Sequence, residues 1–200
     1  MFGFQSSKFL KLAVAAAAFA SHAAFAAPVN ISGELSASDP TYNRPFSLSS
    51  LSSVGTNVAY DLYGFHVSAN GVYTIEATSF SATGSDTFMA LYRGTFNAAS
   101  PLANLVQIDD DSGIGLLSLL TSTLQADTQY FVALSSYGNN AYGSYTGVFN
   151  TVSGGGQVIL GNLDAPPGPG GPGEVPEPGT LALLPLALLG MKLARRRKQA

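Results

Sequence analysis

Apolar and polar residues alternate along the middle of the chain from Val58 onward, the spacing that places side chains on one face of a β-strand. Residues 63–67 and 73–77 each put an aromatic or aliphatic side chain at every second position. Asn70 and Gly71 lie between these runs, and both residue types tolerate the positive φ angles of a tight turn. The pattern therefore predicts two antiparallel strands joined by a hairpin.

Other segments of the body also have the length and composition of strands. They are Thr87–Arg93, Leu105–Ile108, Leu116–Leu124, Tyr130–Ser135 and Ser144–Val152. No stretch of the body shows helical periodicity of useful length, and Gly, Asn, Asp and Ser separate the segments. The sequence thus predicts an all-β fold, an antiparallel β-sandwich, in which Thr87–Arg93 is a central strand because both of its faces are apolar.

The first residues have the three-part layout of a secretory signal peptide. Lys8 and Lys11 precede an apolar stretch, and small residues surround the expected cleavage site between Ala26 and Ala27. The apolar stretch is shorter than the roughly 20 residues that span a bilayer. We therefore expect residues 1–26 to form a signal helix that directs the chain to the secretion machinery and is removed by signal peptidase.

The exported body is strongly acidic. The whole chain has a formal net charge of −3, yet residues 27–179 hold all 12 acidic residues and only Arg44 and Arg93 as bases. Nucleic-acid affinity rests on Lys and Arg contacts to phosphate, so this charge excludes nucleic acid as a partner. The chain has no cysteine, so the body lacks disulfides and thiolate metal sites, and its stability must come from packing.

Residues 57–149 resemble the bacterial pre-peptidase C-terminal domain. The resemblance rests on the segments YDLYGFHV, GVYTIEA, SDTFMALYRGTF, LVQIDDDSG, LQADTQYFVALSSY and GSYTGVF. It implies a small, jelly-roll-like sandwich that acts as an accessory domain, binds matrix or polysaccharide and, in some relatives, binds calcium. The nine tyrosines have two interpretations, as rings that stack on sugars or as core and edge residues.

An acidic turn follows Leu105–Ile108. Asp109, Asp110 and Asp111 are consecutive, and Asp86 begins the neighbouring strand. Ca²⁺ prefers clustered carboxylate oxygens in loops, although this loop lacks the glycine and glutamate positions of an EF-hand. Two interpretations therefore stay open: a solvated turn whose Asp side chains cap backbone N–H groups, or a calcium site formed by the four carboxylates.

The body shows no catalytic constellation in its sequence. His66 is the only histidine left after removal of the signal peptide, and its strand position predicts that it faces outward. The G-x-S-x-G motif of a nucleophilic serine is absent. No spacing brings together two of the carboxylates that glycoside cleavage requires, among Glu34, Asp61, Glu76 and Asp86. We expect a protein that is not an enzyme, with a secreted hydrolase or its accessory domain as the alternative.

The chain ends in segments of distinct composition. Residues 154–174 are rich in Gly and Pro and have little to bury, which is typical of a linker. A short motif, an apolar run and a basic cluster follow: Val175, Pro176, Glu177 and Pro178; Leu181–Leu193; and Arg195, Arg196, Arg197 and Lys198. As a helix the apolar run would be about 20 Å long, which spans a bilayer core of about 30 Å only marginally. The basic cluster would stay cytoplasmic.

This order of motif, apolar span and basic end resembles the PEP-CTERM sorting signal. Such signals are recognised in Gram-negative bacteria by an exosortase, a transpeptidase-like membrane enzyme that cuts near the motif and routes the protein to the envelope or extracellular polymer. Together with the signal peptide (1–26), the β-sandwich (27–153) and the linker (154–174) predicted above, the resemblance implies a sorting signal with a transmembrane helix over residues 175–200. We therefore expect a protein that resides transiently in the inner membrane and then at the cell surface or in a biofilm matrix, with exosortase and exopolysaccharide as partners.

Overall fold

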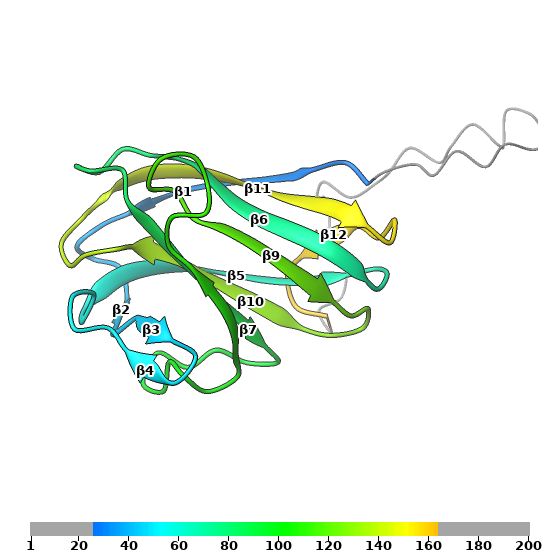
Figure 1. Cartoon of the computed structure of the whole chain (residues 1–200), viewed down its shortest axis with the longest axis horizontal. Coiled ribbons are helices and arrows are strands. Elements are labelled where there is room, and N and C mark those ends of the chain that lie inside the picture. Colours follow the sequence, from blue (N-terminus) through cyan, green and yellow to red (C-terminus); the bar gives the residue numbers. More distant parts are fainter. Residues whose placement is uncertain (1–25, 164–200) are drawn as a thin grey trace, which may run out of the picture.

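The computed structural model describes residues 26–163, all of whose regular structure is β (Figure 1). The strands are β1 (Val29–Leu35), β2 (Thr41–Tyr42), β3 (Pro45–Ser47), β4 (Ser50–Leu51), β5 (Val58–Val67), β6 (Gly71–Phe80), β7 (Thr87–Arg93), β8 (Leu105–Asp109), β9 (Leu119–Leu124), β10 (Tyr130–Ser136), β11 (Gly143–Ser153) and β12 (Val158–Leu160). Within this part of the chain no helix is long and apolar enough to cross a membrane.

Several predicted segments lie outside the described residues. They are the signal helix up to residue 25, the linker from residue 164, the motif Val175–Pro178, the membrane helix and the basic cluster Arg195–Lys198.

The strands form two large antiparallel sheets and a small two-stranded sheet of β3 and β4. One has four strands in the order β1-β11-β6-β9, and the other has the order β12-β5-β10-β7-β8 with β2 paired to β5. The chain changes sheet after β1 and at every connection from β5 to β12 except β7–β8, and it closes the first sheet by pairing β11 with β1. This connectivity is that of a jelly roll, so the predicted all-β, jelly-roll-like sandwich is confirmed.

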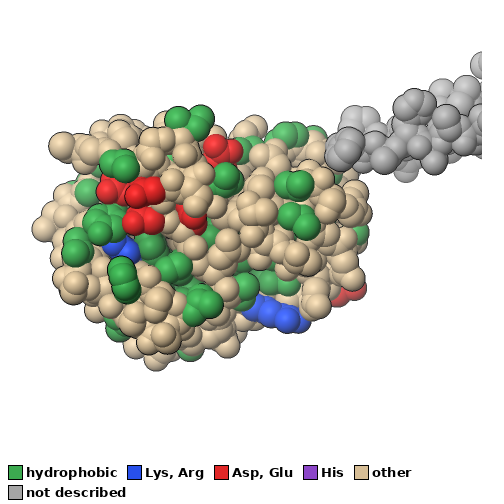
Figure 2. Space-filling model, in the orientation of Figure 1, with side chains coloured by type: hydrophobic (Ala, Val, Ile, Leu, Met, Phe, Trp, Pro, Cys, Tyr) green, Lys and Arg blue, Asp and Glu red, His purple; other side chains and the backbone are tan. Residues whose placement is uncertain are grey.

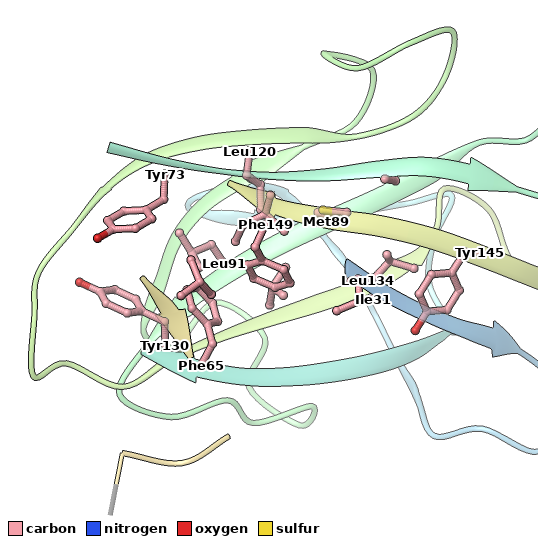
Figure 3. Packing of buried hydrophobic residues seen from close by; sticks show 14 of the residues in the cluster. Ile31, Phe65, Tyr73, Met89, Leu91, Leu120, Tyr130, Leu134, Tyr145 and Phe149 are labelled. Atoms are coloured by element: carbon pink, nitrogen blue, oxygen red, sulfur yellow. The ribbon is translucent and has the colours of Figure 1, made fainter. Parts of the chain in front are cut away.

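The alternation of the sequence produces the main core between the sheets (Figure 3). Phe65, Met89 and Leu91 project from the six-stranded sheet and meet Leu120 and Phe149 of the four-stranded sheet, all of them buried. Residues at the intervening positions of the four-stranded sheet face solvent, the pattern expected of an antiparallel sheet with one covered face.

β7 is apolar on both faces because it contributes to two cores. Met89 and Leu91 point into the main core, whereas Phe88 and Tyr92 belong to a second cluster on the outer face of the same sheet. There Tyr92 packs edge-on against Phe96, with ring centroids 4.9 Å apart. As predicted, β7 is an interior strand, and it lies between β10 and β8.

The domain continues past the predicted boundary at residue 153. β12 pairs with the end of β5, and Gln129 holds the segment after it, since its Oε1 accepts a bond from Leu163 N at 2.6 Å. The start of the linker was therefore predicted too early. Gly154 and Gly155 have positive φ and form a turn between β11 and β12, so this glycine-rich segment connects two strands and is not part of a linker.

The sandwich has two different ends. The loops before β5, β7, β9 and β11 lie at one end, because alternate connections of an antiparallel sandwich share an end. β1 begins and β11 finishes at the other end, where residues 26 and 163 also lie (Figure 1). Residue 163, the last described residue, therefore lies at the end opposite the loops before β5, β7, β9 and β11.

Candidate functional site

Four sheet-crossing loops meet at the end of the sandwich opposite the termini. They comprise residues 36–57, 81–86, 110–118 and 137–142. Backbone hydrogen bonds join them: Tyr137 N donates to Asp86 O at 3.1 Å. The loops therefore form one connected surface.

A pair of buried hydroxyl groups holds the acidic turn in place. Thr87 Oγ1 lies 3.0 Å from Ser118 Oγ and accepts a bond from Ser118 N at 2.8 Å. Immediately before Asp86, Ser85 adopts a φ of 49°, a left-handed conformation that is uncommon for residues other than glycine. The turn at Ser85 and the hydroxyl pair together place Asp86 beside the acidic turn.

Three of the four predicted carboxylates come together. Oxygens of Asp86, Asp110 and Asp111 all lie within 4.8 Å of one another. The Oδ1 atoms of Asp86 and Asp110 are buried and have no hydrogen-bond partner among the described residues. Burial, helped by the neighbouring charges of Asp111 and Asp86, raises the pKa of Asp110 to about 6. Burial and Asp111 also raise the pKa of Asp86, so the group is short of positive charge.

Asp109 has a different role. Its Oδ1 accepts hydrogen bonds from Ser112 N at 3.1 Å and from Leu119 N at 2.7 Å. These bonds close the acidic turn, as the capping interpretation expects. Asp109 therefore caps the turn, as the first interpretation predicts, while Asp86, Asp110 and Asp111 form a cluster of carboxylates.

Arg44 is a member of the site that the sequence analysis did not identify. The residue is only 2% exposed, and its Nε donates to Tyr137 O at 2.7 Å while Nη1 donates to Pro45 O at 3.2 Å. The guanidinium lies between two aromatic rings, 4.3 Å from the centroid of Phe88 and 4.2 Å from that of Tyr137. Arg44 therefore joins its own loop to the loop at Tyr137 and to strand β7. Its charge acts to lower the pKa values of Asp86 and Asp110, against the larger effects that raise them.

A pocket of about 380 Å³ opens at these loops. Its lining residues are Arg44, Phe46, Phe88, Ile108, Asp109, Asp110, Asp111, Ser112 and Tyr137. Figure 2 shows acidic side chains beside a basic one at this end of the molecule, with hydrophobic side chains around them. The pocket thus combines carboxylate acceptors, one fixed cation and aromatic walls.

The donor set suits a hard divalent cation. Ca²⁺ takes six to eight oxygen ligands, and Asp86, Asp110 and Asp111 offer at least one oxygen each within a small volume. A bound cation would give a partner to the two buried oxygens that have none among the described residues, Asp86 Oδ1 and Asp110 Oδ1. Water, backbone carbonyls or a ligand would supply the remaining positions.

The other residues considered from sequence lie elsewhere. His66 is half-buried on β5 opposite Ile159 of β12, and its Nδ1 has no hydrogen-bond partner among the described residues. Asp61 accepts a hydrogen bond from Tyr145 Oη at 2.5 Å, and that hydroxyl also lies 2.5 Å from Tyr63 Oη. The buried tyrosines serve packing rather than a sugar platform; they are Tyr42, Tyr73, Tyr92, Tyr130 and Tyr145.

The predicted signal cleavage site lies outside the sheets. Ala26 and Ala27 precede β1 and make no strand pairing, and Ala27 is exposed. Cleavage between them would leave every residue of β1 in the mature protein.

Comparison with known proteins identifies a motif at the end of the chain. No curated protein matches the chain. Residues 174–198 match the PEP-CTERM protein-sorting motif. This match includes the predicted motif Val175–Pro178 and the basic cluster Arg195–Lys198. The chain therefore carries a PEP-CTERM sorting motif, which marks it as an exported protein that is processed by an exosortase and resides transiently in the membrane.

Proposed function

We propose that this protein is a non-catalytic adhesion or polysaccharide-associated sandwich of a Gram-negative cell surface or extracellular matrix. The observation that carries the proposal is that the chain has a sorting motif at residues 174–198 and a loop pocket at the end of the folded domain opposite residue 163. A domain held through its C-terminal linker would present the pocket away from the membrane. In the biofilm matrix the exopolysaccharide is then the nearest abundant ligand.

The pocket offers suitable chemistry for a polysaccharide. Carboxylate oxygens of Asp110 and Asp111 accept hydrogen bonds from hydroxyl groups, and the exposed ring of Phe46 provides an apolar face for a sugar ring. A calcium ion held by Asp86, Asp110 and Asp111 would contribute coordination to ligand oxygens and offset the negative charge of the domain.

A pull-down on the exopolysaccharide of the native host tests the proposal. We expect the mature protein to be retained, and the Asp110→Asn/Asp111→Asn double variant to be retained less. The control is an unrelated acidic β-sandwich of similar size. Retention no greater than that of the control would remove polysaccharide association.

A secreted hydrolase is the second candidate, because the raised pKa of Asp110 beside another carboxyl is a pattern found in acid–base pairs. One oxygen from each of Asp86, Asp110 and Asp111 lies within 4.8 Å of the others, an arrangement that also suits a shared cation or proton. Release of reducing ends from the host polymer, abolished by Asp110→Asn, would favour the hydrolase.

A further inference from the structure

Exposed hydrophobic side chains gather on the loops at the pocket end. Phe46 is 70% exposed, Leu48 58%, Ile114 79% and Leu116 45%. Phe46 and Leu48 belong to the β3–β4 hairpin, and Ile114 and Leu116 belong to the acidic turn. Large apolar side chains that are exposed near one another often mark a surface that binds a partner. We call these four residues, with Asp110 and Asp111, the distal surface.

The pocket lies within the distal surface and connects its two halves. Phe46 of the hairpin and Asp110 and Asp111 of the acidic turn line the same cavity. Ile108 and Tyr137 add apolar walls. A long side chain with an apolar stem and a cationic tip matches this arrangement, because its stem would contact the walls and its tip would reach the carboxylates.

The charge of the domain restricts what can occupy the distal surface. Among residues 26–163 the lysine and arginine side chains are Arg44 and Arg93, and Arg44 is buried between aromatic rings. Arg93 ends β7, at the other end of the sandwich, and donates to Gln125. A second copy of the domain therefore brings like charge to this surface, and anionic lipid does the same.

We propose that the distal surface binds a basic, apolar polypeptide segment of another protein, with a lysine or arginine side chain in the pocket. Charge complementarity selects the basic residues, and the exposed side chains of Leu48, Ile114 and Leu116 select an apolar partner. Aliphatic side chains favour a polypeptide over a sugar chain, because sugars stack on aromatic rings and only Phe46 among the four is aromatic. This interaction adds a protein partner that would use the same carboxylates as the proposed sugar and calcium ion, so the basic segment should compete with both.

Surface plasmon resonance with designed peptides tests the proposal. The mature protein, which ends near Pro178, is coupled to the sensor surface through its C-terminus, with a surface that carries no protein as the reference. The probes are an amphipathic leucine–lysine peptide, the same peptide with glutamate in place of lysine, and the same peptide with serine in place of leucine. We expect saturable binding of the leucine–lysine peptide and binding at least about ten-fold weaker for the other two.

Two double variants locate the binding on the surface. Phe46→Ser/Ile114→Ser removes apolar contact, and Asp110→Asn/Asp111→Asn removes charge; each is expected to weaken binding of the leucine–lysine peptide by at least about ten-fold. The matched control, Glu34→Gln/Leu62→Ser, changes one exposed acid and one exposed leucine on strands β1 and β5 and should bind as the parent does. Unchanged thermal unfolding of each variant by circular dichroism shows that the fold is retained.

Three results would overturn the proposal. One is equal binding of the leucine–lysine peptide to the parent and to both distal variants. Another is equal binding of the glutamate peptide. The third is a dimer in sedimentation velocity that either distal variant abolishes, with no peptide binding, because that result assigns the surface to a second copy of the chain.

Discussion

Replacing Asp110 with asparagine should stabilise the protein at neutral pH. The Asp110 carboxyl shares its surroundings with Asp86 and Asp111, and its Oδ1 is buried without a hydrogen-bond partner among the described residues. Burial and the adjacent negative charges raise the pKa of Asp110 from 3.8 to about 6, so the charged form is disfavoured in the folded state. Asparagine has a similar shape and carries no charge.

The size and sign of the effect follow from this pKa. A rise from 3.8 to about 6 corresponds to about 3 kcal/mol, and because Asp110 is only half-buried, solvent screening reduces the expected contribution to about 1 kcal/mol. Well below pH 3.8 the carboxyl is protonated in both the folded and the unfolded state, so it causes no loss of stability. The loss develops as the pH rises from about 4 to about 6, because the unfolded chain releases its proton first.

Urea unfolding across this range measures the effect. The chain has no tryptophan, so far-ultraviolet circular dichroism is the suitable signal. We expect Asp110→Asn to exceed the parent in unfolding free energy by about 1 kcal/mol at about pH 7.5 and to match it at about pH 3.5. Glu34→Gln, the same charge change on the exposed face of β1, should alter stability by less than about 0.5 kcal/mol. An Asp110→Asn variant that gains nothing at neutral pH, or gains as much at low pH, would refute the reasoning.

Three other predictions follow from the site and the core. Millimolar Ca²⁺ should raise the melting temperature of the parent but not of Asp110→Asn, and no shift in the parent would exclude a calcium site. Arg44→Met should lower the unfolding free energy in urea by about 3 kcal/mol, because it removes charged hydrogen bonds and two ring contacts; a loss under 1 kcal/mol would show that Arg44 is not a link between the loops. Tyr145→Phe should cost about 1.5–3 kcal/mol in the same assay, since Asp61 loses the hydroxyl bonded to it, and a neutral result would mean that water replaces it.

The sequence allowed prediction of the fold where strands are long and alternate. β7 was predicted with the bounds that the structure has, because Thr87–Arg93 is continuously apolar between polar loops. β2, β3 and β4 have two or three residues each, too few for any periodicity to appear. β12 follows a run of glycines that looks like the start of a linker, and only its pairing with β5 shows that it belongs to the domain.

The candidate site was only partly predictable from the sequence. Asp110 and Asp111 are adjacent in the chain, and the expected neighbouring strand suggested Asp86, so three carboxylates were correctly placed together. The separate role of Asp109 depends on hydrogen bonds to Ser112 and Leu119, which sequence does not display.

Arg44 gave a weak signal, as one of the few bases in an acidic body. Its burial, however, depends on the rings of Phe88 and Tyr137, and these come from distant parts of the chain. Such a site emerges only when the sheet-crossing loops are brought to the same end of the sandwich.

The most direct test of the central claim is the intact mass of the mature protein in the membrane and extracellular fractions of its native host. Exosortase processing predicts an extracellular species that begins at Ala27 and ends near Pro178, because the motif lies within the matched residues 174–198. The same species should be depleted from the membrane fraction. A protein that retains Arg195–Lys198 and stays in the membrane would contradict the account and identify the tail as a permanent anchor.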